Sequence, residues 1–250
     1  MTKPVPGEET FISHLIELRD RLVRASIGIA VVCAALMFWP GPSRIYDFIA
    51  RPMIASLPVG SKMIATGVIS PFLVPMKVTL VIAFILALPW VLYQLWAFIA
   101  PGLYAHEKRL IAPLVVSSSL LFMMGVAFCY FLVFGRVFEF INHFSPTSIS
   151  VMPDIENYLD FVMSMCLAFG ATFEVPVVVV ILVRMGLVSV AKLKEIRPYA
   201  IVGAFAVAAI VTPPDAVSMF SLAIPMCLLF ELGLLVSPAF VRATTAPEEV

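Results

Sequence analysis

The stretch W-A-F-I-A-P-G-L-Y-A-H-E-K-R, residues 96–109, separates two long apolar runs and decides how the rest of the chain is arranged. Its centre, Ala100-Pro101-Gly102, cannot continue a helix, because proline lacks a backbone N–H donor and glycine loosens the backbone. A turn therefore separates the aromatic residues before it from the charged residues after it. The sequence predicts that Phe98 and Glu107 lie near each other across this turn.

The runs on either side of this loop are typical of a membrane protein. Of the 250 residues, 62% are hydrophobic and only 13% are charged, with a mean hydropathy of +1.05. This is far more apolar than a soluble core of this size needs. The runs are continuous rather than alternating, and each is about as long as the roughly 20 residues of a membrane-spanning helix. The composition predicts an all-α polytopic membrane protein.

Prolines, glycines and charges divide the chain into six predicted spans within a single transmembrane domain, residues 1–250. The spans cover about residues 22–39, 72–95, 110–138, 155–185, 198–211 and 216–236, and residues 1–10 and 242–250 are expected to be disordered tails. The fourth span is longer than a bilayer core of about 30 Å requires, so it must protrude, tilt or kink at Pro176. The fifth is too short, because about 14 residues of helix reach only about 21 Å.

Aspartate residues directly before two of the spans are typical helix N-caps. Asp154 follows Pro153 before the fourth span, and Asp215 follows Pro213-Pro214 before the sixth. The side-chain oxygen of an N-cap residue accepts a hydrogen bond from a free N–H group of the first turn. The sequence therefore predicts that these two aspartates begin the helices that follow them.

The distribution of basic residues predicts which side of the membrane each loop faces. Of the 16 Lys and Arg residues, eleven lie in the flanks and loops on the amino-terminal side of the six-span arrangement, and five lie on the opposite side. Cytoplasmic loops carry an excess of Lys and Arg. The rule therefore predicts that both termini and the loops at 96–109 and 186–197 are cytoplasmic.

No enzyme motif, metal site or nucleic-acid-binding surface is indicated by the sequence. The four cysteines, Cys33, Cys129, Cys166 and Cys227, lie inside apolar runs, and the three histidines are scattered. Neither a nucleophilic triad nor a phosphate-binding loop is found. The formal net charge of zero argues against a polybasic surface. We therefore expect no enzymatic activity, cofactor, metal or nucleic acid.

Acidic residues beside the membrane are candidates for binding a cationic ligand. Glu17 with Arg21, and Asp20 with Arg24, are i,i+4 pairs on an amphipathic helix ahead of the first span, and simple pairing is one interpretation. The other is that Glu17 and Glu107, which face one compartment, hold a pair of guanidinium groups through bidentate hydrogen bonds. Glu107 also has a structural interpretation, because the start of a helix favours a carboxylate.

Glu174 and Glu231 are two of the acidic residues that lie inside predicted spans. If Arg184 marks the inner interface, Glu174 lies about 15 Å inside the membrane, where a charge is costly and a neutral carboxyl still needs a hydrogen-bond partner. Pro176 removes the helical donor of the Thr172 carbonyl, which a protonated Glu174 or a water can replace. Glu174 therefore either joins helices or serves transport, whereas Glu231 is near enough to the inner surface to snorkel.

Eight motifs follow one another along nearly the whole chain. They are H-L-I-E-L-R at 14–19, P-F-L-V-P-M-K at 71–77, W-A-F-I-A-P-G-L-Y at 96–104, H-E-K-R at 106–109, F-E-V-P at 173–176, R-P-Y at 197–199, T-P-P-D at 212–215 and F-E-L-G at 230–233. With this combination of motifs the sequence resembles the TatC family, the receptor subunits of the twin-arginine protein translocase.

The resemblance implies a cup-shaped bundle with short helices five and six in the bacterial inner membrane, with both termini cytoplasmic. Such a protein binds twin-arginine signal peptides of folded precursors at its cytoplasmic face and nucleates the translocation site, with transport driven by the protonmotive force. The implied partners are the single-span subunits TatB and TatA, further copies of the chain, and the lipid bilayer.

The resemblance also implies roles for individual residues. Signal-peptide binding is implied for Glu17, Arg19, Phe98 and Glu107, and an intramembrane polar role for Glu174. Contact with the partner subunits is implied for Thr212, Asp215 and Met219. Met219 departs from the family pattern, because some relatives carry a polar residue there.

An alternative function is proton-coupled secondary transport, with Glu174 and Glu231 carrying the protons. Such transporters are commonly built from internal repeats with broken helices in corresponding halves. Spans one to three and four to six show no such symmetry, whereas Glu17, Phe98 and Glu107 supply the acidic and aromatic site that a receptor needs. The receptor is the favoured hypothesis.

Overall fold

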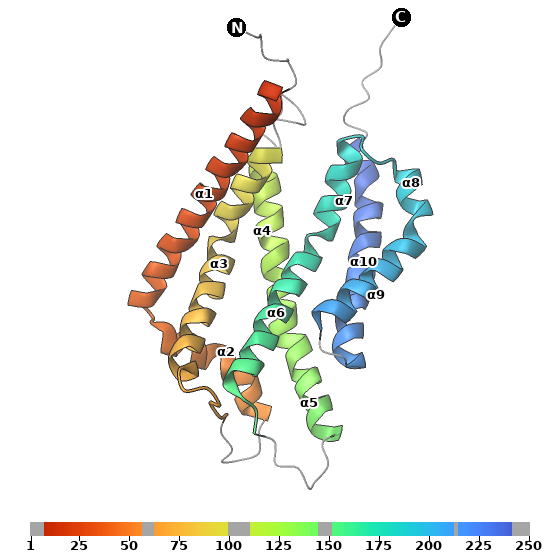
Figure 1. Ribbon diagram of the computed structural model, residues 1–250. Helices are drawn as coiled ribbons and strands as arrows, with labels where there is room; N and C mark the ends of the chain where they lie inside the picture. The colour runs from red at the N-terminus through yellow and green to blue at the C-terminus, as the bar shows by residue number, and fades with distance from the viewer. Residues whose placement is uncertain (1–7, 57–62, 100–110, 145–151, 213–214, 242–250) are drawn as a thin grey trace, which may run out of the picture. The chain divides into compact units, whose positions relative to one another are not determined.

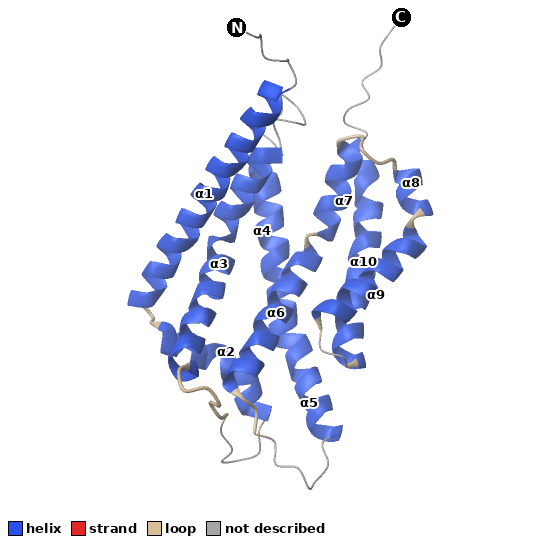
Figure 2. Cartoon of the chain, in the orientation of Figure 1, coloured by secondary structure: helices blue, strands red, loops and turns tan. Residues whose placement is uncertain are grey.

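The computed structural model describes residues 8–56, 63–99, 111–144, 152–212 and 215–241, which are almost entirely helical (Figure 1, Figure 2). The helices are α1 (Glu8–Phe38), α2 (Pro42–Ser56), α3 (Ser70–Ile99), α4 (Ile111–Phe128), the π-helix η3 (Cys129–Val133), α5 (Phe134–Phe144), α6 (Ile155–Phe173), α7 (Val175–Arg184), α8 (Val190–Glu195), α9 (Arg197–Val211) and α10 (Ala216–Val241). Among these residues, extended backbone pairs only at a parallel bridge between Ile64 and Asp154. The prediction of an all-α chain is confirmed.

Several helices are suited to crossing a membrane. Those in the described residues that are long and apolar enough are Ile12–Phe38, Ser70–Ile99, Ala112–Phe140, Ile155–Arg184 and Ala216–Ala239. The apolar helix α9 has 15 residues, about 22 Å, which is shorter than a bilayer core of about 30 Å. The prediction of a polytopic membrane protein is confirmed. The count of six spans, the cup shape and the cytoplasmic termini stay predictions. Of the expected tails, residues 1–7 and 242–250 lie outside the described residues, whereas residues 8–10 are helical and begin α1.

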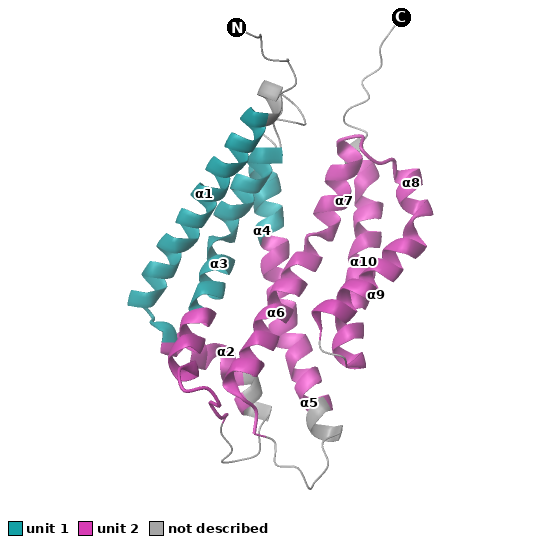
Figure 3. Ribbon diagram, in the orientation of Figure 1, with its two compact units in different colours: residues 1–42, 79–119 teal, residues 43–78, 120–250 magenta. Residues whose placement is uncertain are grey.

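The chain divides into two compact units (Figure 3). Unit 1 comprises Met1–Pro42 and Thr79–Ser119, and therefore contains α1, most of α3 and the first part of α4. Unit 2 comprises Ser43–Val78 and Leu120–Val250 and contains the remaining helices. The sequence-based prediction of one transmembrane domain over the whole chain stays a prediction.

In unit 1, Trp90 of α3 joins this helix to α1. Its indole Nε1 donates a hydrogen bond to the Arg24 carbonyl oxygen at 3.0 Å, and its ring lies against Gly28, where a Cβ would clash with it. The glycine lets the α1 backbone approach the indole closely. A tight turn follows α1 at Gly41, whose φ of 93° favours glycine and whose N–H bonds to the Leu36 carbonyl oxygen at 3.1 Å.

In unit 2, glycines bring helices into close contact. Gly125 of α4 faces the Phe169 carbonyl of α6, and Gly170 of α6 faces the ring of Phe122 of α4, so neither glycine leaves room for a Cβ. α10 packs against α7 and α9, and Gly233 of α10 lies against the α7 backbone. Small residues at such contacts matter in a membrane, because lipid supplies no hydrophobic drive between helices.

The long helical segment at 155–184 is interrupted at Glu174. α6 ends at Phe173 and α7 begins at Val175. The interruption follows from Pro176, which lacks an N–H donor, and the helical ladder resumes where the Val178 N–H bonds to the Glu174 carbonyl at 3.0 Å. The long span was predicted to protrude, tilt or kink at Pro176. The structure has an interruption of the helix two residues before this proline.

A second irregularity is the π-helix η3, between α4 and α5. The Phe134 N–H bonds to the Cys129 carbonyl oxygen, five residues back, instead of the usual four. A π turn widens the helix locally and changes the direction of the side chains that follow. No sequence pattern predicts it, because this part of the chain is a continuous apolar run.

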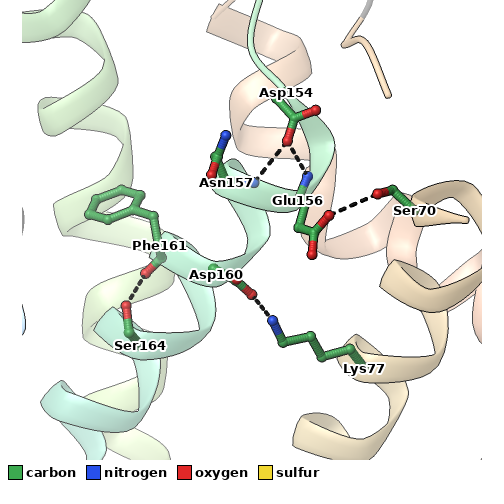
Figure 4. Close-up of polar contacts among 8 residues, drawn as sticks. All are labelled: Ser70, Lys77, Asp154, Glu156, Asn157, Asp160, Phe161 and Ser164. Atoms are coloured by element: carbon green, nitrogen blue, oxygen red, sulfur yellow. Dashed lines mark hydrogen bonds and ion pairs between the residues drawn. The ribbon is translucent and has the colours of Figure 1, made fainter. Parts of the chain in front are cut away.

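Polar contacts join the segment before α3 and the first turns of α3 to the start of α6. Figure 4 shows those of Ser70 and Lys77 on α3. All of them lie within unit 2. The paired residues of this α3–α6 latch are Thr66 with Asp154, Ser70 with Glu156, and Lys77 with Asp160. The Thr66 hydroxyl and N–H both donate to Asp154 Oδ2, at 2.7 and 3.0 Å.

Asp154 and Asp215 cap the helices that follow them. Asp154 Oδ1 accepts hydrogen bonds from the N–H groups of Glu156 at 3.0 Å and Asn157 at 3.1 Å. Asp215 Oδ1 accepts from the Ser218 N–H at 2.7 Å. Both N-cap predictions are confirmed.

Candidate functional site

The polar face of α1 carries the candidate binding residues of unit 1. Arg21 donates through Nε and Nη2 to one Glu17 oxygen, Oε1, at 2.9 and 2.6 Å, so the predicted pair is confirmed. The Glu17 side chain is 37% exposed, and i,i+4 ion pairs stabilise a helix by only about 0.2–0.5 kcal/mol. Both hydrogen bonds from Arg21 end on Oε1. Glu17 Oε2 makes no hydrogen bond within the described part of the chain. That oxygen can accept from an incoming cation.

Phe98, near the end of α3, is held against α1 by His14. The two rings stack with their centroids 4.4 Å apart and their planes inclined by 23°. His14 precedes Glu17 by about one helical turn, and residues at this spacing lie on one face of a helix. The structure therefore brings the Phe98 ring to the part of α1 that presents the Glu17 carboxylate.

Arg19 and Glu107 are the other residues predicted to bind a signal peptide. Arg19 donates through Nε and Nη2 to Oδ1 of the neighbouring Asp20, at 3.0 and 2.8 Å, and its side chain is 71% exposed. Asp20 is thus bonded by Arg19 and not, as predicted, by Arg24. Glu107 lies outside the described residues, so its predicted approach to Phe98 stays a prediction.

Glu174 lies at the break between α6 and α7, in unit 2. Both of its carboxyl oxygens are buried, and its N–H bonds to the Ala171 carbonyl oxygen at 3.1 Å. The segment Ile155–Arg184 around it is apolar enough to cross a membrane. A carboxyl group at such a position is costly to charge and marks a functional candidate.

The residues predicted to contact partner subunits lie at the end of α9 and the start of α10. The Thr212 hydroxyl is buried and donates to the Ala208 carbonyl oxygen of its own helix at 2.8 Å. Asp215 caps α10, and the Met219 N–H bonds to the Asp215 carbonyl oxygen at 3.2 Å. The polar groups of Thr212 and Asp215 thus have local structural roles, and their predicted partner contacts stay predictions.

Glu231 of α10 forms an ion pair with Arg197, the first residue of α9. Arg197 Nη2 donates to Glu231 Oε2 at 2.6 Å, and both side chains are less than half exposed. Sequence reasoning interpreted Glu231 as a snorkelling residue and missed this partner, because the pair joins residues that are 34 positions apart. The ion pair therefore engages Glu231, one of the two residues that would carry protons under the transporter hypothesis.

His14 is the site residue that sequence reasoning missed. Its position one turn before Glu17 was a signal, but its contact with Phe98 depends on the packing of α3 against α1. No group of three or more His, Cys, Asp or Glu side chains in the described ranges is arranged to hold a metal ion. The arrangement in unit 1 suits a cationic ligand with an adjoining apolar group.

Comparisons with known proteins identify close relatives. The sequence matches the family model described as Sec-independent protein translocase protein (TatC) over residues 13–225. The TatC protein of Haemophilus influenzae is 48% identical over 233 residues, which cover 93% of this chain and 90% of that protein. The TatC protein of Escherichia coli strain K12 is 48% identical over 245 residues, covering 98% and 94% of the two chains.

Solved structures match as well. A crystal structure of the twin arginine translocase receptor TatC is similar with a TM-score of 0.79 at 34% sequence identity, covering 92% of this chain and 100% of that chain. A second crystal structure of this receptor, in DDM, gives a TM-score of 0.80 at 34% identity and covers 90% of this chain and 99% of that chain.

Proposed function

Because the chain belongs to the TatC family, and is thus a subunit of the Sec-independent protein translocase and not an enzyme, we propose that it binds twin-arginine signal peptides. The proposed site lies in unit 1, on the polar face of α1 and the adjoining end of α3. Its residues are Glu17, Arg19 and Phe98, together with Glu107. The ligands are the signal peptides of folded precursor proteins.

The observation that carries this proposal is the stack of Phe98 on His14. It places an aromatic ring against His14, which precedes Glu17 by about one helical turn. Glu17 Oε2 makes no hydrogen bond within the described residues. A signal peptide with an arginine pair and an apolar segment offers the complementary groups, a planar guanidinium and an apolar surface. Glu107 supplies the second carboxylate, one for each arginine.

The site is built for arginine rather than for any cation. A guanidinium presents a planar fork of donors that matches a carboxylate, whereas a lysine ammonium is a point charge with a different geometry. Arg21 already uses this fork on Glu17 Oε1. An incoming guanidinium therefore shares the carboxylate with Arg21 or displaces it, and we expect a lysine to do either poorly.

The wider assembly follows from the same family membership. We infer a multi-pass protein of the bacterial inner membrane with both termini cytoplasmic, which nucleates a translocation site with TatB-like and TatA-like subunits and further copies of itself. Contacts with the single-span subunits are proposed at Thr212, Asp215 and Met219, and the protonmotive force as the energy source. We do not propose the transporter alternative, because Glu231 has a cationic partner and the family is a protein translocase.

The proposal is tested by the affinity of the purified chain for a fluorescent signal peptide that carries Arg-Arg or Lys-Lys. We expect tighter binding of the Arg-Arg peptide, and a roughly tenfold to hundredfold loss of its affinity in Glu17→Gln, because charged hydrogen bonds contribute about 1.5–3 kcal/mol. Phe98→Ala should also weaken binding.

A matched control for Glu17 is Glu195→Gln. Glu195 is an exposed carboxylate that pairs with Lys192 one turn away on α8, so its loss removes a similar helix-surface pair without touching unit 1. Equal affinity for both peptides would contradict the proposal, as would unchanged affinity when Glu17→Gln and Glu107→Gln are combined.

A further inference from the structure

Unit 2 contains a cavity that no role described above explains. Its volume is about 530 Å³, within the range of roughly 300–1,000 Å³ that is typical of small-molecule sites. One wall is formed by the end of α4, η3 and the start of α5, and the other by the first three turns of α10. Both walls belong to helical segments that are apolar enough to cross a membrane.

The lining is mostly apolar. Phe128, Leu132, Phe220 and Pro225 are among its residues, Ser221 adds a hydroxyl, and Arg136, at one end, is the only charged residue among the described ones that line it. The Arg136 side chain is exposed and has no ion pair or hydrogen bond within the described part of the chain. A cavity with one free guanidinium and apolar walls is complementary to an amphipathic anion.

The position of Arg136 fits the membrane surface. It lies near the end of the apolar segment Ala112–Phe140, and the opposite wall starts at Ala216, the first residue of the apolar segment Ala216–Ala239. Arginine at the end of a spanning helix lies at headgroup level. The cavity therefore opens at the headgroups and extends from there into the hydrocarbon.

The depth of the cavity distinguishes the possible occupants. From Arg136 to Phe128, or from Ala216 to Pro225, the walls extend about 12–14 Å along their helices. That is about one leaflet of a bilayer whose hydrocarbon core is about 30 Å thick. A spanning helix of a partner would need a groove of the full thickness, whereas a lipid of one leaflet fits this depth.

From these observations we propose that the cavity is a phospholipid site, in which Arg136 binds the phosphodiester and the apolar walls hold an acyl chain. Arginine binds phosphate through two parallel hydrogen bonds. The π turn of η3 supports the assignment, because Leu132 belongs to it and such turns are frequent at functional sites. The bound lipid would fill the space between α10 and η3.

The test compares phosphatidylglycerol with diacylglycerol, which has the same chains but no phosphate, in native mass spectrometry of the full chain purified in detergent. We expect the wild type to bind phosphatidylglycerol more tightly. Arg136→Gln should weaken that binding roughly tenfold or more and leave diacylglycerol binding unchanged. Arg44→Gln, which removes an exposed arginine from α2 of the same unit, is the control and should change neither affinity.

Larger side chains in the cavity lining should exclude the acyl chain, which both lipids share. Ser221→Phe on α10 is expected to weaken the binding of both lipids, and Leu132→Trp on the opposite wall should do the same, so a folding defect in one variant does not decide the result. If all these variants bind both lipids as the wild type does, or if Arg44→Gln matches Arg136→Gln, the proposal is wrong.

A photoreactive residue at Phe220, used in native membranes, separates a lipid from a protein occupant. Phospholipid adducts are expected, since Phe220 lines the cavity and is 47% exposed. Adducts confined to a single-span protein or to a second copy of the chain would overturn the assignment.

Discussion

At the scale of single residues, the buried carboxyl of Glu174 gives a prediction about transport. Both oxygens are buried at the α6–α7 break, so we expect the group to act through hydrogen bonding rather than through a solvated charge. Glu174→Gln keeps hydrogen-bonding groups of similar size, whereas Glu174→Leu removes them. Export of a folded precursor should therefore decrease from wild type to Gln to Leu.

Export and signal-peptide cross-linking should be measured in the same membranes, with cross-linking nearly unchanged in both variants. Equal export by Glu174→Leu would leave the carboxyl without a function in transport. Loss of cross-linking in step with export would mean that Glu174 only maintains the fold.

The residue scale also shows what sequence can predict about the site. The Glu17–Arg21 pair follows from i,i+4 spacing alone and is present. Asp20 pairs with Arg19 instead of the predicted Arg24, and this depends on side-chain rotamers that sequence spacing does not determine. The stack of His14 on Phe98 joins two helices that are far apart in the chain, so only the packed structure places them together.

At the scale of helices, the contact of α4 with α6 predicts that a substitution at Gly125 of α4 costs stability. A Cβ at Gly125 would lie 2.5 Å from the Phe169 carbonyl oxygen, which is backbone and cannot rotate away. Gly125→Ala should therefore destabilise the protein by about 1–3 kcal/mol. Thermal unfolding in detergent measures the effect.

Gly135, on α5, is the matched control. A Cβ there would meet no atom within 4 Å, so Gly135→Ala should be neutral or stabilising by up to about 1 kcal/mol through its better helix propensity. Similar losses in both variants would mean that propensity or insertion, and not the α4–α6 contact, determines the result.

The α3–α6 latch predicts a dependence of stability on pH. The Thr66 hydroxyl, helped by the N–H groups of Asn157, Thr66 and Glu156, lowers the pKa of Asp154 below its usual value of 3.8. Because the folded chain holds this carboxylate charged to lower pH than the unfolded chain does, the stabilisation is complete above pH 3.8 and is lost as the pH falls through the lowered pKa.

Asp154→Asn isolates this contribution, because asparagine still caps a helix but carries no charge. The difference in unfolding temperature between wild type and Asp154→Asn should be constant near neutral pH and should shrink in acid below pH 3.8. A difference that stays constant down to the most acidic pH at which the protein folds would show that the charge of Asp154 contributes nothing.

Some features of the helices can be predicted from the sequence and others cannot, for physical reasons. The caps at Asp154 and Asp215 and the break before Pro176 follow from local chemistry, an accepting oxygen or a missing donor, and are present. η3 has no local signal, because it lies inside a continuous apolar run of the sequence. The latch joins residues more than 80 positions apart, which a single sequence does not pair.

At the scale of the whole molecule, the excess of basic residues on one side predicts the orientation in the membrane. In a chain whose four native cysteines are replaced, Lys194→Cys on α8 should react only with thiol reagents that reach the cytoplasm. Ser43→Cys, on α2, should react only with reagents applied from outside. Both positions are exposed, so burial does not explain a lack of labelling, and the reversed pattern would contradict the proposed orientation.

The close contact of α4 with α6 has a consequence for the evolution of the family. A larger side chain at position 125 would push α6 away from α4. Because Gly170 of α6 faces Phe122 of α4, this movement would also open space around Gly170. The two positions are therefore not free to drift separately. Across related sequences, side-chain volumes at 125 and 170 should change together, and the volume at 122 should compensate for that at 170, whereas residue 135 should vary independently of these three.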